Sequence, residues 1–229
     1  ILLPTPENLR DLLQAVLDYW SPATNPKIRY FPNDRDERRY FRERDYAILV
    51  ALIDTAARIG EILALDLQDF RPRDLEVHIT QSKGDRPRQV PVSGGLVKAM
   101  AGYLAVRPPG GRERLFLNQF GDPVDYSHFG KAFRHYRDFA GLPKFTLHSI
   151  RHFTGTQLAK HGVKAAQLIL GHKRLETTNR YTHAQLDWAK DLHKQVNVLG
   201  SVMVNVRSQK QVREKKIGKR NPKIPVDKP

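Results

Sequence analysis

Apolar residues recur at helical spacing over most of this chain and at strand spacing in one short region. Residues 4–20, PTPENLRDLLQAVLDYW, carry leucine and valine three and four positions apart behind a proline, a threonine and an acidic first turn, which predicts a helix. The apolar density of 44–65, RDYAILVALIDTAARIGEILAL, predicts a helix more buried than the first, with a break near Arg58. Between them, the charged and proline-bearing 21–44 predicts a surface loop.

In one region apolar and polar residues alternate, as is typical of β-strands. Residues 75–81 (LEVHITQ) and 88–93 (RQVPVS) are rich in β-branched side chains, and a loop at Lys83 to Pro87 separates them, which predicts two antiparallel strands. Helical spacing then returns, with glycines where helices should end, over 94–106, 126–141, 147–162, 163–172 and 174–196. The expected fold is therefore mainly α with a small antiparallel β-sheet, an α+β arrangement.

The C-terminal end differs in composition from the rest. Residues 207–229 hold nine Lys and Arg against two acids and almost no apolar periodicity, which predicts a mobile basic tail. We therefore expect one folded domain over 1–199 and a basic C-terminal tail over 200–229. Because the chain begins at Ile1 without a signal-peptide pattern, we expect it to be a fragment or the ordered part of a longer protein.

Charge and cysteine usage narrow the class of partner and compartment. The chain has 39 Lys and Arg against 24 Asp and Glu, a net charge of +15 at pH 7 and a pI near 10.1. Such a surface suits a polyanion, and nucleic acid is the leading partner. A membrane surface is the competing partner, but no apolar run approaches the roughly 20 residues of a spanning helix. The lack of cysteine removes disulfides, thiolate metal sites and thiol nucleophiles, which fits a reducing, cytoplasmic location in association with DNA.

Two basic residues in the first half are candidates for phosphate binding. Arg58 follows a buried helix and precedes Glu61 by three positions, a spacing typical of a structural salt bridge. An arginine at a buried helix end would also be held rigidly, as bidentate phosphate recognition requires. Lys83 lies at the tip of the predicted hairpin, either as a solvated turn residue or as an ammonium placed beside a leaving oxygen in a DNA groove.

The segment LHSIRHF places two candidates on one helical face. His148 and Arg151 are three positions apart, so an imidazole and a guanidinium could share a phosphate, or they could be structural. His148 and His152 also have the spacing of a zinc pair. That metal reading is weak, because Ser149 stands where the HExxH motif has its glutamate.

The segment LGHKRLETTNRYTH holds the last candidates. Gly171 is typical of a helix C-cap, His172 could face solvent, and Tyr181 nine residues later could be an ordinary packing residue. Each of these signals has a structural explanation when it is taken alone.

In their order and spacing, however, these residues resemble the catalytic set of the tyrosine recombinases, the integrase family of phages, transposons and chromosome-dimer resolution systems. ARIGEILAL is similar to the first arginine box, LHSIRH to the His-x-x-Arg box, and LGHKRLETTNRYTH to the closing His and Tyr segment. Two departures sit beside these motifs: Ala56-Ala57 where a Gly-Leu pair is frequent, and Ser149-Ile150 where Asp-Leu is more usual.

The resemblance implies the catalytic domain of a DNA breaking and rejoining enzyme. Its catalytic residues would be Arg58, Lys83, His148, Arg151, His172 and Tyr181. Tyr181 would attack the scissile phosphodiester to form a 3′-phosphotyrosyl bond and release a 5′-hydroxyl. Arg58 and Arg151 would bind the non-bridging oxygens with a hydrogen bond from His172. Lys83 would protonate the leaving 5′ oxygen.

The remaining roles and partners also follow from the resemblance. His148 would accept or relay the tyrosine proton, and Glu61 would orient the first-arginine segment. Because arginines and a lysine supply the positive charge, no metal, ATP or other cofactor is expected. The partners would be double-stranded DNA and three further copies of the chain in a homotetramer, with no membrane. The family's N-terminal core-binding domain has no match here.

Two choices stay open at the level of sequence. Residues 200–208, GSVMVNVRS, alternate apolar residues, as either a short disordered end or a segment that docks on a neighbouring subunit, as C-terminal ends do in this family. The alternative functions are type IB topoisomerase-like DNA relaxation and non-catalytic DNA binding. The short spacing from His172 to Tyr181 favours a recombinase, because the topoisomerases commonly insert a linker before the tyrosine.

Overall fold

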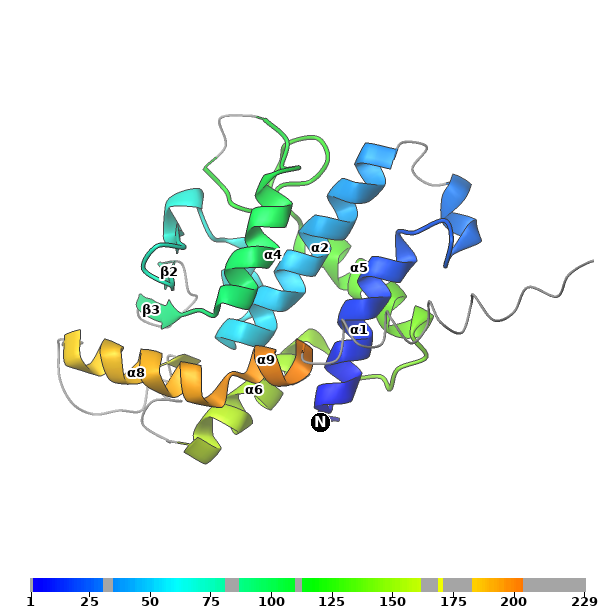
Figure 1. The fold of residues 1–229 in the computed structure, drawn as a ribbon. Helices are drawn as coiled ribbons and strands as arrows, with labels where there is room; N and C mark the ends of the chain where they lie inside the picture. Colours follow the sequence, from blue (N-terminus) through cyan, green and yellow to red (C-terminus); the bar gives the residue numbers. More distant parts are fainter. Residues whose placement is uncertain are drawn as a thin grey trace, which may run out of the picture.

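Helices make up most of the described chain, and a small sheet lies at one side of them (Figure 1). The computed structural model describes residues 2–30, 35–80, 87–109, 113–161, 169–170 and 183–203. In chain order the helical elements are α1 (Pro6–Tyr19), η1 (Pro26–Tyr30), α2 (Arg35–Thr55), α3 (Ile59–Leu63), η2 (Leu67–Asp69), α4 (Gly94–Leu104), α5 (Tyr126–Phe139), α6 (Leu147–His161), α8 (His183–Val196) and α9 (Val198–Met203). The expected class, mainly α with a small antiparallel sheet, is confirmed.

Helix α1 begins as its sequence indicates. Thr5 Oγ1 accepts a hydrogen bond from the amide of Asn8 at 3.2 Å, while Asn8 Oδ1 accepts one from the amide of Thr5 at 3.1 Å. Pro6 occupies the first turn, where its missing N–H costs nothing. The apolar stripe of this helix is fully buried at Leu9, Leu12, Leu13 and Val16.

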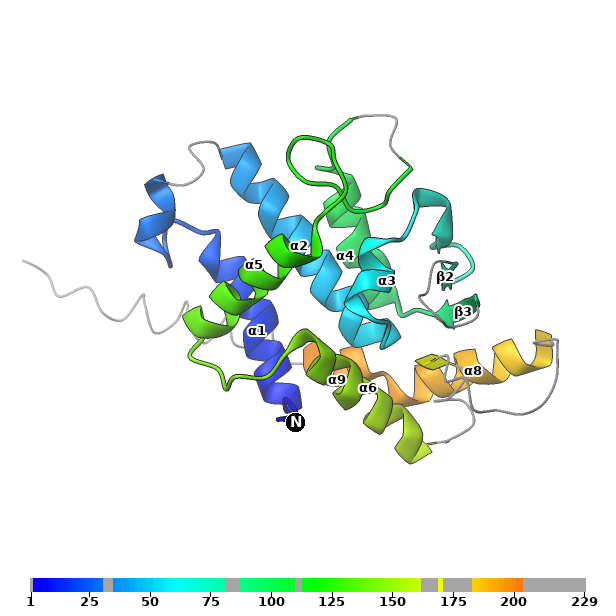
Figure 2. The ribbon, with the colours of Figure 1, turned by 180° about the vertical axis from the view of Figure 1, so that it is seen from behind.

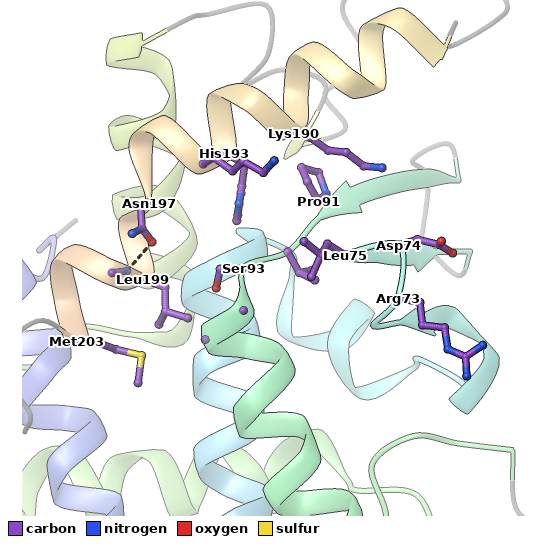
Figure 3. A pocket seen from close by; sticks show the side chains of 15 residues that line it. Arg73, Asp74, Leu75, Pro91, Ser93, Lys190, His193, Asn197, Leu199 and Met203 are labelled. Carbon is purple, nitrogen blue, oxygen red and sulfur yellow. Dashed lines mark hydrogen bonds between the residues drawn. The ribbon is translucent and has the colours of Figure 1, made fainter.

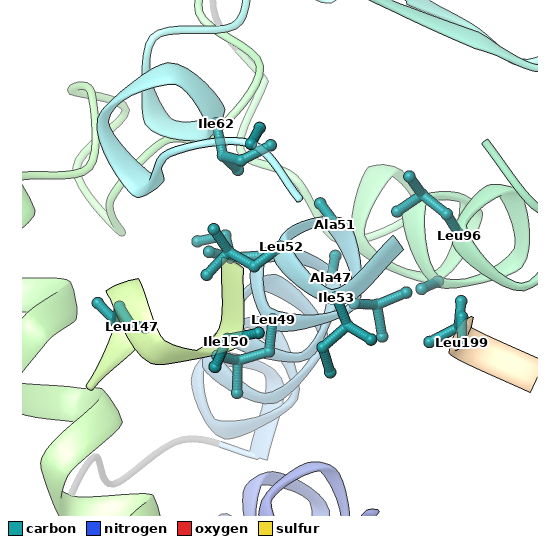
Figure 4. Close-up of a cluster of buried hydrophobic side chains, with 14 of the residues drawn as sticks. Ala47, Leu49, Ala51, Leu52, Ile53, Ile62, Leu96, Leu147, Ile150 and Leu199 are labelled. Carbon is teal, nitrogen blue, oxygen red and sulfur yellow. The ribbon is translucent and has the colours of Figure 1, made fainter. Parts of the chain in front are cut away.

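Helix α2 is the centre of the core. Its segment from Ala47 to Ile53 is buried on every side, so the helix is covered all round rather than on one stripe. Figure 4 shows Ile150 of α6, Leu96 of α4 and Leu199 of α9 around the side chains of this segment. Helices α1, α4 and α6 all contact α2, which explains the dense apolar run in its sequence.

The same helix begins well before the apolar run, so the surface loop predicted over 21–44 is wrong from residue 35 onward. Tyr40 is buried and donates its hydroxyl to the carbonyl of Leu117. Arg44 is also buried; its Nε lies 2.7 Å from Asp45 Oδ1, and its guanidinium lies 4.9 Å from the centre of the Phe41 ring. Paired charges and aromatic contacts thus allow a highly charged segment to pack as a helix.

The sheet has three strands in the order β1 (Phe70–Arg71), β2 (Glu76–Ile79), β3 (Arg88–Pro91), all antiparallel. Val77 is paired with Val90, so the predicted hairpin is confirmed. Strand β1 was not expected, because two residues are too short to show an alternating pattern. Residues 81–86, with Lys83 among them, lie outside the described residues.

Helix α9 crosses the boundary expected between 199 and 200. Its Val198, Leu199 and Val202 are buried in the core, and Arg10 Nε donates to the carbonyl of Val202 at 3.0 Å. Figures 1 and 2 both show α8 running past β3 and α9 ending beside α1. Residues 204–229, which include most of the predicted tail, lie outside the described residues. Within the described part, no helix combines the length and hydropathy needed to cross a membrane.

Candidate functional site

The backbone turns sharply between α2 and α3, and this turn positions Arg58. Thr55 Oγ1 donates to the carbonyl of Ala51 at 2.6 Å and accepts from the amide of Ala57 at 3.2 Å, which ends α2. Ala56 then takes a left-handed conformation with φ of 52°. Arg58 is extended and caps the start of α3, so its side chain leaves the chain at a fixed break between two helices.

Glu61 is the buried anion at the centre of the site. Its Oε2 accepts a hydrogen bond from the amide of Arg58 at 2.8 Å, and its Oε1 lies 3.3 Å from Arg58 Nη1. The Glu61 side chain is 4% exposed, whereas the Arg58 side chain is 44% exposed. The structural salt bridge considered for this pair is therefore present, and the arginine still reaches the surface.

A second arginine on Glu61 was not anticipated from the sequence. Arg88, at the start of β3, donates from Nη1 and Nη2 to the two oxygens of Glu61 at 3.0 and 2.7 Å. Its Nε donates to the carbonyl of Ile169 at 3.0 Å, and its side chain is only 1% exposed. The alternation of residues along this strand could have indicated Arg88 as a buried residue, because Arg88, Val90 and Val92 share one face and all three are buried.

Arg151 lies on α6 and is buried as well. Its Nη1 donates to the carbonyl of Ala56 and its Nη2 to the carbonyl of Leu170, both at 2.7 Å. The same Nη1 lies 3.9 Å from Glu61 Oε2. Arg151 therefore joins the helix break at Ala56 to the residue that precedes Gly171 in the chain.

His148 sits one turn before Arg151 on α6 and is exposed. Partial burial lowers the pKa of His148 below its ordinary value of 6.5, and electrostatic interactions with the nearby His152, Arg151 and Arg58 lower it further. The imidazole is therefore neutral at pH 7 and able to accept a proton. The rings of His148 and His152 meet edge to face with centres 4.5 Å apart.

Three of the six predicted residues are thus brought together, because Arg58 and Arg151 both reach Glu61 and both influence His148. The other three, Lys83, His172 and Tyr181, lie outside the described residues. The described cluster contains three guanidinium groups around one carboxylate, an excess of positive charge that suits an anion.

Helix α8 begins two residues after Tyr181 and is anchored to the body of the protein. Lys190 Nζ lies 2.6 Å from Glu76 Oε1 of β2, and His193 Nε2 lies 2.9 Å from the carbonyl oxygen of Asp54 at the end of α2. Figure 3 shows Lys190 and His193 on the side of α8 that faces the sheet and the start of α4.

Two other features of the described residues bear on ligands. A cavity of about 610 Å³ lies between α8, α9, the start of α4 and the sheet, and Arg58, His148 and Arg151 do not line it. The described side chains contain no group of three or more His, Cys, Asp or Glu placed to hold a metal ion.

Comparison with known proteins identifies relatives of this chain. Residues 33–187 match the model of the "Phage integrase family". The tyrosine recombinase XerC of Chlamydia pneumoniae is 30% identical over 186 residues, which are 77% of this chain and 59% of that protein. The crystal structure of XerA recombinase aligns with a TM-score of 0.60 and 24% identity, covering 85% of this chain and 64% of that one.

A structure of XerH site-specific recombinase bound to its difH substrate before cleavage aligns with a TM-score of 0.59 and 23% identity. It is matched over 82% of this chain and 53% of that one, a likeness that shows the fold. The chain spans about half the length of the curated relatives it matches, between 42% and 59% for three XerC proteins. Because the family match covers well over half of the 229 residues, the chain belongs to the phage integrase family.

Proposed function

We propose that this chain is the catalytic domain of a site-specific DNA recombinase that cleaves and rejoins DNA through a 3′-phosphotyrosyl intermediate. The observation that carries the proposal is that Arg58 and Arg151 meet on the buried Glu61 and both act electrostatically on His148, in a member of a family whose relatives are named tyrosine recombinases. Residues 1–199 form the catalytic domain in this proposal, and 200–229 form its C-terminal extension.

The chemistry assigned to the described residues follows from their surroundings. Arg58 is half exposed and is held at its base by Glu61, so it binds a non-bridging oxygen of the scissile phosphate. Arg151 is held by two backbone carbonyls and adds positive charge from a fixed position. His148 has a lowered pKa, so it accepts the phenolic proton as Tyr181 attacks.

The rest of the step is assigned to residues outside the described part. The Tyr181 oxygen bonds to phosphorus as the bond from phosphorus to the 5′ oxygen breaks. Lys83 gives a proton to that oxygen, which leaves as a 5′-hydroxyl, and His172 donates a hydrogen bond to the transferring phosphoryl group. Attack by the 5′-hydroxyl of a partner strand reverses the step, so no external energy source is consumed.

Double-stranded DNA is the substrate in this proposal, and paired DNA sites are held by a homotetramer. The net charge of +15 supplies non-specific affinity through phosphate contacts, which should fall steeply as salt rises. The relative XerH was solved with its difH substrate, which supports DNA as the ligand class. We further propose that the recombinase serves a phage or another mobile element.

The proposal is tested with a library of nicked duplexes whose central sequence is randomised. The nick lets the short cleaved strand diffuse away, so the covalent protein–DNA link accumulates and is recovered from a denaturing gel for sequencing. We expect the parental chain to give a covalent band in buffer that contains EDTA, and Tyr181→Phe to give no band. A band that survives this substitution means that Tyr181 is not the nucleophile.

The enriched sequence also separates the recombinase from its two alternatives. A recombinase transfers the cleaved strand to a separate 5′-hydroxyl strand carrying the matching overhang. Relaxation of supercoiled plasmid without such transfer indicates a topoisomerase-like enzyme. DNA binding without any covalent band indicates a non-catalytic relative.

A further inference from the structure

We propose that Arg88 is a positioning residue for the cleavage step, a role that rests on the recombinase function proposed above. A single guanidinium joins two segments of the site that are far apart in sequence. Through Glu61 it reaches the segment that carries Arg58, and through the carbonyl of Ile169 it reaches the segment that leads to His172. Arg88 itself lies on β3, the second strand of the hairpin that carries Lys83.

All three nitrogens of the Arg88 guanidinium donate hydrogen bonds. Nη1 and Nη2 face the two oxygens of Glu61 at 3.0 and 2.7 Å, while Nε faces Ile169 at 3.0 Å on the other edge of the same plane. A lysine has one nitrogen and cannot reproduce three contacts in one plane. The position therefore requires arginine for geometry as well as for charge.

Stability is a weak explanation for this pair. Both side chains are almost fully buried, at 1% for Arg88 and 4% for Glu61, and desolvating two charges offsets most of their attraction. Apolar residues of similar volume would often fold as well. The Arg88–Glu61 ion pair also contacts Arg58 and Arg151. Its effect on the charge of these two arginines explains the pair better than stability does.

Charge balance gives that explanation. Arg58, Arg88 and Arg151 surround the carboxylate of Glu61. Because Arg88 takes both carboxylate oxygens at 3.0 and 2.7 Å, Glu61 holds the backbone of Arg58 but pairs less closely with its guanidinium, which lies at the longer distance of 3.3 Å. Without Arg88, the full charge of Glu61 would act on Arg58, which is proposed to bind phosphate, and on Arg151, which adds positive charge to the site.

The test compares Arg88→Lys with the parental chain in single-turnover cleavage of the enriched nicked duplex. A second duplex carries a methylphosphonate at the scissile position, where a methyl group replaces one non-bridging oxygen. That substrate has no negative charge to be neutralised, so it depends less on well-placed arginines. Arg44→Lys is the matched control, because Arg44 is another buried arginine with a carboxylate partner and contacts none of the site residues in any hydrogen bond given above.

We expect Arg88→Lys to cleave the phosphodiester about 10-fold to 100-fold more slowly, as misplacement of about 1 Å in a catalytic group does. The methylphosphonate should be slowed by less than about threefold, and Arg44→Lys should slow both substrates equally. Equal slowing of both substrates by Arg88→Lys, or no slowing, overturns the proposal. Arg88→Gln, which keeps an amide donor, replaces Arg88→Lys if the lysine variant does not fold.

One readout needs no cleavage and separates this proposal from the proposed function. If the parental chain forms no covalent link that depends on Tyr181, the recombinase function fails. The positioning of Arg58 is then read by amide hydrogen exchange, since its N–H is bonded to Glu61. Faster exchange at Arg58 in Arg88→Lys, with no change in Arg44→Lys, supports the coupling, and unchanged exchange overturns it.

Discussion

Arg151→Ala and Arg58→Ala should lower the free energy of unfolding by very different amounts, although each substitution removes one positive charge. Arg151 donates to the carbonyls of Ala56 and Leu170, both at 2.7 Å, from a side chain that is 6% exposed. Arg58→Ala instead leaves its backbone bond to Glu61 intact and removes a side chain that is 44% exposed.

The magnitudes follow from these contacts. Each buried carbonyl that loses its donor costs about 1–3 kcal/mol, so Arg151→Ala should lower the free energy of unfolding by about 2–6 kcal/mol. For a domain of this size that corresponds to a melting temperature lower by roughly 5–20 °C. Arg58→Ala removes the partly exposed ion pair with Glu61, and loss of such a pair should cost no more than about 1 kcal/mol.

The assay is urea unfolding at 25 °C followed by circular dichroism, with both variants and the parental chain in the same buffer. We expect the midpoint of Arg151→Ala to fall clearly below that of Arg58→Ala, with little change in slope. If the two variants unfold within about 1 kcal/mol of each other, the structural role assigned to Arg151 is wrong. Confirmation would mean that cleavage lost in Arg151→Ala reports folding as well as catalysis.

Three further outcomes are expected. In single-turnover cleavage with subsaturating DNA, the rate should fall at acid pH as His148 is protonated. The apparent pKa of this fall should lie below 6.5, because burial and nearby cations lower the pKa of His148. The fall in rate at acid pH should be absent in His148→Asn. Burial alone would raise the pKa of Glu76, but hydrogen bonds from Lys190 and His78 lower it below 4.5. The stabilisation of the fold by ionised Glu76 is therefore present above pH 4.5 and is lost as the pH falls further. The free energy of unfolding of Glu76→Gln should depend less on pH in the acid range, and an unchanged pH dependence contradicts this. Leu199→Ala, at a fully buried position of α9, should cost about 2–5 kcal/mol in urea unfolding, and similar midpoints for it and a surface leucine variant contradict the docking of α9.

Elements with a strong apolar period could be predicted from the sequence. The stripe of α1 and the alternation of the hairpin depend on neighbours within a few residues, so the sequence shows them directly. The first turns of α2 could not be predicted, because their charges are stabilised by contacts such as that of Tyr40 with the distant Leu117.

The site shows the same division. Motif order indicated Arg58, His148 and Arg151, and the structure brings these three together. It did not indicate Arg88, because a charged residue beside a turn is usually solvated. Only its inward place in the strand alternation, with a carboxylate partner 27 positions earlier in the chain, reveals it.

The left-handed Ala56 bears on how much order the site has before a ligand binds. Glycine adopts that conformation without strain, whereas alanine does so at a cost of about 1–2 kcal/mol. The buried methyl group of Ala56 recovers part of that cost, but alanine at a positive φ remains strained. The contacts around the turn hold it in this conformation, because Arg151 donates to the carbonyl of Ala56 and Thr55 accepts from the amide of Ala57. We therefore expect the Arg58 segment to be ordered before a ligand binds, so that less entropy is lost on binding.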